Sequence, residues 1–302
     1  MTRRLLVLGR SGQLATSLSG LAKGAGWEID TVDRSEADFT RPDQVIKAVH
    51  ARPAIDAVIN AVASNDVDGA EVDDREAIAV NTLTPAELGR ACADRGIPLL
   101  HVSTDYVFPG RQGGKYRESD TPSPLNAYGR SKLKGESGVL SASTRHAVFR
   151  TAWVFNGTHK NFLTAMLAQI GVRQEVRVVS DQIGSPTHAD TLASGLLRAA
   201  DYLLAGKARG GLFHLCSPDP VSRSDFADFI YRTAARHDGR CPRVIPIGSA
   251  DWPSKARRPD NSSLDCDLFE TTFDYALPHW RTGVEQAVSR WMDGRSGPSS
   301  TP

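Results

Sequence analysis

Two side chains four residues apart, Tyr128 and Lys132, are the pair in this sequence best suited to acid–base chemistry. On a helix, residues at this spacing lie on one face and meet. An ammonium beside a phenol favours the phenolate and lowers the tyrosine pKa from about 10 toward neutrality, where proton transfer to a carbonyl oxygen is efficient. The same spacing arises by chance in many helices. The pair therefore predicts a proton donor only if its surroundings agree.

The surroundings supply a helix start and a third polar group. Asn126 can cap a helix that carries both Tyr128 and Lys132. Thr104 ends an apolar run that is typical of a fourth strand, and doubly wound sheets bind ligands at that carboxyl edge. There its hydroxyl would hydrogen-bond a substrate carbonyl, although capping of the strand end is the alternative for a lone threonine. We expect Thr104, Tyr128 and Lys132 to be catalytic.

A glycine-rich turn directly after the first apolar run predicts a phosphate cradle. Gly9 permits a tight turn, Gly12 lets the backbone approach a pyrophosphate at a helix N-terminus, and Ala15 lets the helix pack closely. Glycine spacing alone is weak evidence, because many strand-to-helix turns carry it. The flanking strand and helix favour a dinucleotide cofactor. The contacts expected from this turn are Gly9, Arg10, Gly12, Gln13 and Leu14.

The choice between the two nicotinamide cofactors stays open. Asp33 closes the second apolar run, where a carboxylate can accept hydrogen bonds from the ribose diol of NADH. Arg34 adjoins it, and Arg34 with Arg10 can hold the 2′-phosphate of NADPH, unless both arginines are simply solvated. We therefore expect NADPH or NADH, with Asp33 and Arg34 in the cofactor site.

Five short apolar runs predict buried strands, each followed by helical spacing or capping signals. They are residues 5–8, 28–32, 57–60, 99–103 and 147–151. Strands that alternate with helices predict an α/β fold with a Rossmann-type doubly wound parallel sheet. We expect an NAD(P)-binding domain at 1–152, to which later segments can add elements, a smaller and mainly substrate-binding lobe at 153–293, and a disordered tail at 294–302.

Composition excludes several classes of function. The 302 residues include 36 basic and 35 acidic side chains, a formal net charge of +1 that offers no footprint for nucleic acid or an anionic membrane. No segment approaches the roughly 18 apolar residues of a membrane span. The four cysteines are scattered, and no carboxylate or histidine cluster has metal-ligand spacing. We expect a cytoplasmic protein with a small-molecule partner and no metal, as a monomer or homodimer.

Nearly the whole sequence resembles the dTDP-4-dehydrorhamnose reductase family, a branch of the extended short-chain dehydrogenase/reductases. The glycine-rich turn and Tyr-x-x-x-Lys are shared by that superfamily. Ser-Thr-Asp-Tyr-Val-Phe at 103–108 and Asp-Gln-Ile-Gly-Ser-Pro-Thr at 181–187 look specific to this branch. Further matching motifs stand at 60–63, 67–71, 80–81, 124–132, 150–155 and 257–262.

The resemblance implies a concrete reaction and a wider site. NAD(P)H would deliver hydride to the C4 ketone of dTDP-4-dehydro-β-L-rhamnose, and Tyr128 would protonate the alkoxide to give dTDP-L-rhamnose. Lys132 would also hold the nicotinamide ribose. The implied substrate site comprises Val67, Thr104, Asp105, Tyr128, Trp153 and Arg258. The expected cofactor site adds Asp38, Phe39, Ala61, Val62, Ala63, Tyr128 and Lys132 to the residues given above.

Departures from the family pattern leave the sugar open. Ser64 and Asn65 stand where Tyr-Thr is usual, Pro109 where Asp is usual, and Ser180 where an acid is usual. A reductase of another nucleotide-linked 4-keto-6-deoxysugar therefore stays possible. A 4,6-dehydratase is disfavoured, because Tyr106 stands where the resemblance places a glutamate base. A non-catalytic NAD(P)-binding subunit similar to the methionine adenosyltransferase β-subunit is not excluded by an intact triad.

Overall fold

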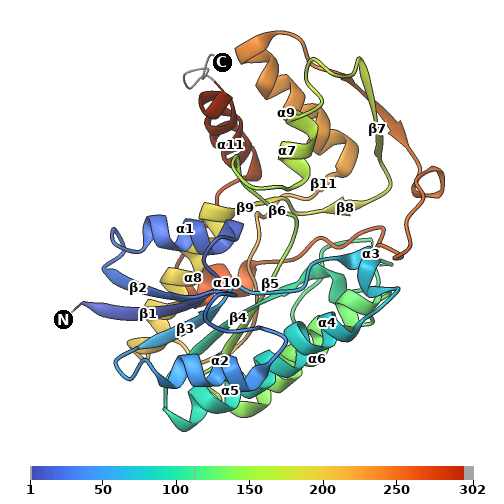
Figure 1. Ribbon diagram of the computed structural model, residues 1–302. Coiled ribbons are helices and arrows are strands. Elements are labelled where there is room, and N and C mark those ends of the chain that lie inside the picture. The colour runs from blue at the N-terminus through green and yellow to red at the C-terminus, as the bar shows by residue number, and fades with distance from the viewer. Residues whose placement is uncertain (1, 112, 296–302) are drawn as a thin grey trace.

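A six-stranded parallel sheet organises the computed structural model, which describes residues 2–111 and 113–295 (Figure 1). The strand order is β10-β5-β4-β3-β1-β2, so the chain reverses direction across the sheet between β1 and β3. The bounds are β1 (Arg3–Leu8), β2 (Trp27–Val32), β3 (Ala57–Asn60), β4 (Leu99–Thr104), β5 (Ala147–Thr151) and β10 (Gly211–His214). This is the doubly wound arrangement that the alternating pattern predicts.

Helices cover both faces of the sheet, and alternate residues of β1 pack against the two helical layers. Leu5 and Val7 join a core with α1 (Gln13–Leu21), α8 (Ala189–Leu204) and α10 (Asp267–Phe273). Leu6 and Leu8 join a core on the other face. The helices there are α2 (Pro42–His50), α5 (Thr84–Asp94) and α6 (Ala127–Ala142). Because both faces are covered, each of these strands buries apolar side chains, which in β2 stand at its two ends.

A smaller lobe lies beyond the carboxyl ends of the strands (Figure 1). Its core includes the fully buried aromatic side chains Phe226 and Trp280. The lobe contains β6 (Val154–Phe155), α7 (Phe162–Leu167), β7 (Glu175–Val179), β8 (Ile183–Gly184), β9 (Thr187–His188), β11 (Val221–Ser222), α9 (Arg223–Asp238), β12 (Arg243–Ile247) and α11 (Trp280–Arg295). Between them, the pairs β6–β9 and β7–β12 are parallel, and β8–β11 is antiparallel.

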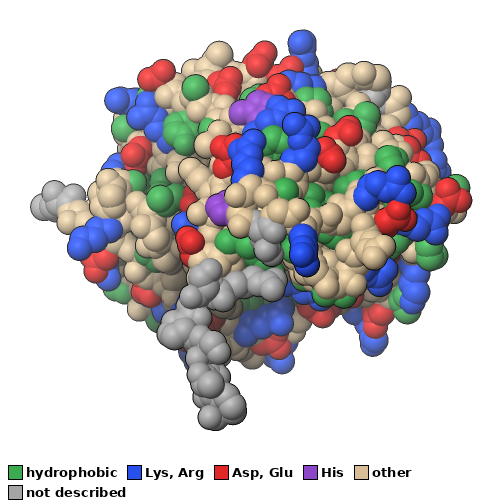
Figure 2. All heavy atoms as spheres, turned by 90° about the horizontal axis from the view of Figure 1, so that it is seen from above, with side chains coloured by type: hydrophobic (Ala, Val, Ile, Leu, Met, Phe, Trp, Pro, Cys, Tyr) green, Lys and Arg blue, Asp and Glu red, His purple; other side chains and the backbone are tan. Residues whose placement is uncertain are grey.

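Short helical turns connect the longer elements. They are α3 (Val67–Ala70), α4 (Arg75–Ile78), a π-helical turn (Ala79–Leu83), and two 3₁₀ turns (Asp105–Val107 and Ser249–Asp251). None of the described helices is long and apolar enough to cross a membrane. On the face seen from above, basic and acidic side chains are interspersed, in keeping with a net charge near zero (Figure 2).

The five predicted strands are all present, and three of them are one or two residues longer than predicted. After residue 152 the chain returns to the sheet, because α8 packs on α1 and β10 pairs with β5. Of the predicted disordered tail, Gly294 and Arg295 are instead the last residues of α11, and 296–302 lie outside the described residues.

Candidate active site

Two adjoining cavities lie where the sheet edge faces the smaller lobe. The first, which we call the sheet-edge cavity, has a volume of about 690 Å³. Eleven of the expected site residues line it: Gly12, Gln13, Leu14, Ala61, Val62, Ala63, Thr104, Asp105, Tyr128, Lys132 and Trp153. The structure therefore brings together, in one space, residues from the first turn, the ends of β3 and β4, and helix α6.

Other expected residues lie outside this cavity. Gly9 is inside the turn, and Asp33 and Arg34 follow β2. Phe39 is buried in the core against α2, while exposed Asp38 closes a local turn through hydrogen bonds from Thr40. Val67 begins α3 and lines neither cavity, and Arg258 lines the second one. The roles expected of Asp38, Phe39 and Val67 stay predictions.

The first turn has the geometry of a phosphate cradle. Gly9 has a φ of 107°, which favours glycine, and it joins β1 to the turn. Gly12 is the N-cap of α1 and provides no side-chain cap, so the first N–H groups of this helix are free to bind a ligand. A Cβ added at Gly12 would meet nothing within 4 Å. The site therefore has room and donors for a pyrophosphate.

Asp33 and Arg10 form an ion pair at the adenosine end of the expected cofactor site. The Arg10 Nη1 lies 2.7 Å from Asp33 Oδ2, and its Nη2 lies 3.0 Å from Glu36 Oε1. Hydrogen bonds from the Ser35 hydroxyl and backbone, aided by Arg10, lower the pKa of Asp33. Asp33 is thus ionised at the end of β2, beside a guanidinium that two carboxylates already bind.

Replacing Asp33 by Ala should shift cofactor preference toward NADPH by about tenfold, because one carboxylate that repels a 2′-phosphate is lost and Arg10 is partly released. The measurement is kcat/KM for NADPH and for NADH. Asp43→Ala, at an exposed ion pair on α2, serves as the control. An unchanged ratio would show that Asp33 does not read the 2′ position.

Tyr128 lies half-buried at the mouth of the sheet-edge cavity. Its hydroxyl is 3.4 Å from Asn65 Oδ1, and its ring makes an edge contact with Tyr106 at 6.1 Å between centroids. Burial raises the pKa of Tyr128 above its usual value, and a hydrogen bond with Thr104 opposes the rise. The expected lowering of the pKa by Lys132 is wrong in this structure. Tyr128 is instead a neutral phenol that holds its proton.

The reason is the direction of Lys132. Its side chain is 1% exposed, and its Nζ donates to the Val102 carbonyl oxygen at 2.6 Å. Burial lowers the pKa of Lys132 from 10.5 to about 8, although Glu136 opposes this effect. No described contact joins the Lys132 ammonium to the Tyr128 phenol. The spacing of four residues places both at one cavity, but it does not make them touch.

A buried histidine lies against Lys132 and was not anticipated. Val62 N–H donates to Asn60 Oδ1 at 3.1 Å, which turns the Asn60 Nδ2 toward His101 Nδ1 at 3.2 Å. His101 Nδ1 is then the acceptor, and the ring proton is on Nε2, 3.5 Å from Lys132 Nζ. Burial and the Lys132 charge hold the pKa of His101 well below 6.5. His101 is therefore neutral beside Lys132.

Thr104 connects the phenol to a buried carboxyl group. Its hydroxyl donates to Asp105 Oδ1 at 3.0 Å and accepts from the Tyr106 backbone N–H at 3.1 Å. Ser262 donates to the other Asp105 oxygen. Burial raises the pKa of Asp105 to about 6 in spite of these hydrogen bonds. Thr104 thus performs the strand-end capping that was its alternative role, while its oxygen also lies beside Tyr128.

Helix α6 is held firmly, which fixes where Tyr128 and Lys132 point. Asn126 caps it as predicted, through a hydrogen bond of 2.8 Å from the Gly129 N–H. Farther along, Glu136 forms a buried bidentate ion pair with Arg150 of β5, at 2.9 and 2.7 Å. A Cβ at Gly129 would overlap the Tyr106 carbonyl, so the helix approaches the end of β4 closely.

Asn65 is one of the departures from the family pattern, and it is the one that reaches the phenol. The backbone of Ser64 is fixed by Asn81, whose amide oxygen accepts a hydrogen bond from the Ser64 N–H at 2.9 Å. Ser180 hydrogen-bonds the Ile247 carbonyl oxygen and lines neither cavity. Of the unusual residues, Asn65 therefore has the most direct access to a substrate ketone.

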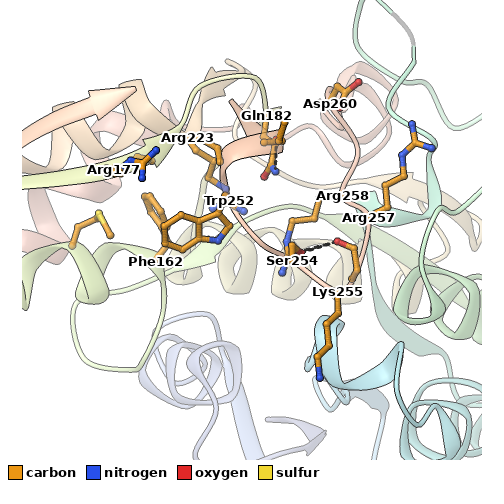
Figure 3. Close-up of a pocket in the computed structure, with 16 residues that line it drawn as sticks. Phe162, Arg177, Gln182, Arg223, Trp252, Ser254, Lys255, Arg257, Arg258 and Asp260 are labelled. Atoms are coloured by element: carbon orange, nitrogen blue, oxygen red, sulfur yellow. Dashed lines mark hydrogen bonds between the residues drawn. The ribbon is translucent and has the colours of Figure 1, made fainter. Parts of the chain in front are cut away.

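The second cavity, which we call the lobe cavity, has a volume of about 710 Å³ and is lined by several basic side chains. Its basic side chains are Arg177, Arg223, Lys255, Arg257 and Arg258. Arg223 and Arg258 point toward its middle, whereas Lys255 and Arg257 extend outward (Figure 3). Arg258 is ion-paired with Asp68 at 2.8 Å. Phe162 and Trp252 add aromatic surface, so the cavity suits a planar ring that carries phosphates.

Within the described ranges 2–111 and 113–295, no group of three or more His, Cys, Asp or Glu side chains is arranged to hold a metal ion. Arg223 is the main site residue that sequence reasoning missed, since nothing in its local sequence distinguishes it from a solvated helix residue. Its place becomes visible only in the fold, which brings the first residue of α9 against Trp153 and Phe162.

The combination of a Rossmann-type sheet, a glycine-rich first turn, Thr104 at the end of β4 and a Tyr-x-x-x-Lys helix at the same edge defines a short-chain dehydrogenase/reductase. Within that class the chain belongs to the RmlD family, because the model of the RmlD substrate binding domain matches residues 3–292. This confirms the resemblance inferred from the sequence.

Similar proteins agree with this placement. A dTDP-4-dehydrorhamnose reductase from Sinorhizobium fredii is 37% identical over 287 residues, covering 94% of this chain and 96% of the relative. One from Mycobacterium tuberculosis is 38% identical over 294 residues, covering 95% and 93%. The crystal structure of dTDP-4-dehydrorhamnose reductase from Bacillus anthracis in complex with NADP superimposes with a TM-score of 0.87 at 28% identity, over 95% of this chain and 98% of that one.

Proposed function

We propose that this chain is an NAD(P)H-dependent dTDP-4-dehydrorhamnose reductase, which converts dTDP-4-dehydro-β-L-rhamnose to dTDP-L-rhamnose. One observation carries the proposal: Thr104, Tyr128 and Lys132 line a single cavity with the glycine-rich turn, next to a second cavity rich in cations. The first cavity suits a nicotinamide and a ketone. The second suits a nucleoside diphosphate, so a nucleotide-linked ketosugar fits across the two.

The residues present fit a dinucleotide cofactor. Open space at Gly12 and the free N–H groups of α1 would hold its pyrophosphate, and Asp33 with Arg10 would bind its adenosine ribose. Lys132 would hold the nicotinamide ribose. When bound, the cofactor supplies a hydride to C4 of the sugar.

The protein's own contribution is proton donation and orientation. As C4 gains hydride, the C=O electron pair moves to oxygen, and Tyr128 transfers its phenolic proton there to complete the hydroxyl. The Thr104 hydroxyl lies beside the phenol, and if its proton turns from Asp105 toward the substrate it would donate a hydrogen bond to the same oxygen. A solvent proton then restores Tyr128. Because burial raises the pKa of Tyr128, the phenol keeps its proton near neutral pH.

We further propose a cytoplasmic location, which the state of the cysteines supports. No disulfide joins the cysteines of the described residues, and Cys92, Cys216 and Cys266 are buried, which suits a reducing cytoplasm. The substrate is a small nucleotide sugar, and the proposed state is a monomer or homodimer.

A direct assay tests the function. Loss of nicotinamide absorbance should follow addition of dTDP-4-dehydro-L-rhamnose, and a panel of other nucleotide-linked 4-keto-6-deoxysugars should react with lower kcat/KM. Conversion of dTDP-glucose to a 4-keto-6-deoxy product without reductant would instead show a dehydratase. Cofactor binding with no turnover of any 4-keto sugar, and co-purification of a synthetase, would favour the regulatory subunit.

A further inference from the structure

Arg223 occupies the junction of the two cavities. Only two residues, Phe162 and Arg223, line both cavities among those the structure describes. Arg223 is the first residue of α9, directly after the N-cap Ser222. A cation is unfavourable at a helix N-terminus, because the helix dipole is positive there. Its presence therefore needs a reason other than helix stability.

The Arg223 guanidinium is oriented by aromatic rings. Its Cζ lies 3.4 Å from the centroid of the Trp153 ring and 5.1 Å from that of Phe162. A hydrogen bond with the Tyr106 hydroxyl also engages it. Trp153 itself is fixed in an uncommon backbone conformation, with a φ of 45°, and a methyl at Gly184 would overlap its indole. The indole of Trp153, which the resemblance places in the substrate site, is thus covered on one face by a guanidinium.

The charge of Arg223 lacks a full counter-ion. Among residues 2–111 and 113–295, no carboxylate lies within ion-pair distance of it, in contrast to Arg258, which Asp68 binds at 2.8 Å. The carboxylate that acts on its charge is Asp105, whose two oxygens already accept hydrogen bonds from Thr104 and Ser262. Burial lowers the pKa of Arg223, as expected for a desolvated guanidinium. An anionic ligand would supply the missing charge.

We propose that Arg223 binds the phosphate attached to C1 of the sugar, the β-phosphate of the nucleoside diphosphate, and so sets the ketone against Tyr128. The inference rests on the proposed function. A sugar whose C4 lies at Tyr128 and whose nucleotide lies in the lobe cavity must pass its C1–phosphate link through the junction that Arg223 occupies. The planar guanidinium donates two parallel hydrogen bonds to a phosphate, which an ammonium does not.

The test compares two probes, thymidine diphosphate and thymidine monophosphate, by calorimetric titration of the full chain. Arg223→Met keeps an apolar contact with Trp153 but removes the donors. It should weaken diphosphate binding by about 10- to 100-fold while monophosphate binding changes by less than about threefold. Arg223→Lys should recover part of the diphosphate affinity only. With the ketosugar, KM should rise and kcat should fall, because the ketone is no longer held in register.

Arg232→Met is the matched control, since Arg232 is exposed on the same helix and pairs only with Asp228 in the described contacts. NADPH affinity should be unchanged in all variants, which also shows that each one is folded. Equal weakening of both probes, or of neither, would overturn the role of Arg223. If wild type binds the diphosphate tightly but reduces no 4-keto sugar, the proposed function fails while the Arg223 assignment stands.

Discussion

Replacing Tyr128 by Phe should reduce kcat for the ketosugar by about 10²–10⁴-fold, because the only change is loss of the proton donor. The half-buried ring packs edge-on against Tyr106, and Phe preserves that contact. NADPH affinity should therefore survive. The measurement is the initial rate of nicotinamide oxidation at saturating substrate, together with the dissociation constant of NADPH by fluorescence titration.

Tyr202→Phe is the control for removal of a phenolic hydroxyl, since Tyr202 lies on α8 and bonds Arg198 away from both cavities. Its kcat should match wild type. Turnover that persists in Tyr128→Phe would refute the assignment of the proton donor. In that event Asp105, with a pKa of about 6 and a link through Thr104, would be the next group to test.

The sheet was predictable because its strands are buried on both faces. Such strands are short, continuous apolar runs, and Ala57–Asn60 and Ala147–Thr151 have the bounds that the sequence indicates. The return of β10 (Gly211–His214) to the sheet edge was not specified, because it is an isolated short strand after a long helix. Its place depends on pairing with β5, which local sequence does not encode.

The site was predictable where function depends on backbone and spacing. Gly12 and Tyr128 are placed by a turn and a capped helix, both of which leave local signals. The direction of the Lys132 ammonium was not predictable, because it is set by a long-range hydrogen bond to the Val102 carbonyl oxygen. The position of Arg223 in the site was not predictable for the same reason, because its partners Trp153 and Tyr106 come from distant segments of the chain.

Replacing Lys132 by Met should lower both kcat and NADPH affinity, because one ammonium is expected to serve the ribose and the reaction. We expect about tenfold weaker NADPH binding and at least about 10²-fold lower kcat. Lys134→Met, exposed on the same helix, should change neither. Unchanged NADPH affinity in Lys132→Met would remove the proposed ribose contact.

The same substitution should reveal a stability cost of the buried ammonium. Because the folded protein holds the pKa of Lys132 at about 8 against an ordinary 10.5, folding is penalised while the group is charged in both states. At about 1.4 kcal/mol for each tenfold step in proton affinity, that penalty is about 3 kcal/mol near neutrality, offset in part by the hydrogen bond to Val102. As pH rises from about 8 to about 10.5, the folded state loses the proton first and the penalty disappears.

Lys132→Met should therefore unfold at higher urea than wild type at about pH 7, with a gap that narrows toward about pH 10. Lys134→Met should track wild type at both values, since its exposed ammonium has no comparable burial. A gap that is constant with pH would mean that the difference in stability does not come from the charge of Lys132. A gain in stability coupled to a loss of turnover would identify the buried ammonium as a group kept for catalysis at the expense of the fold.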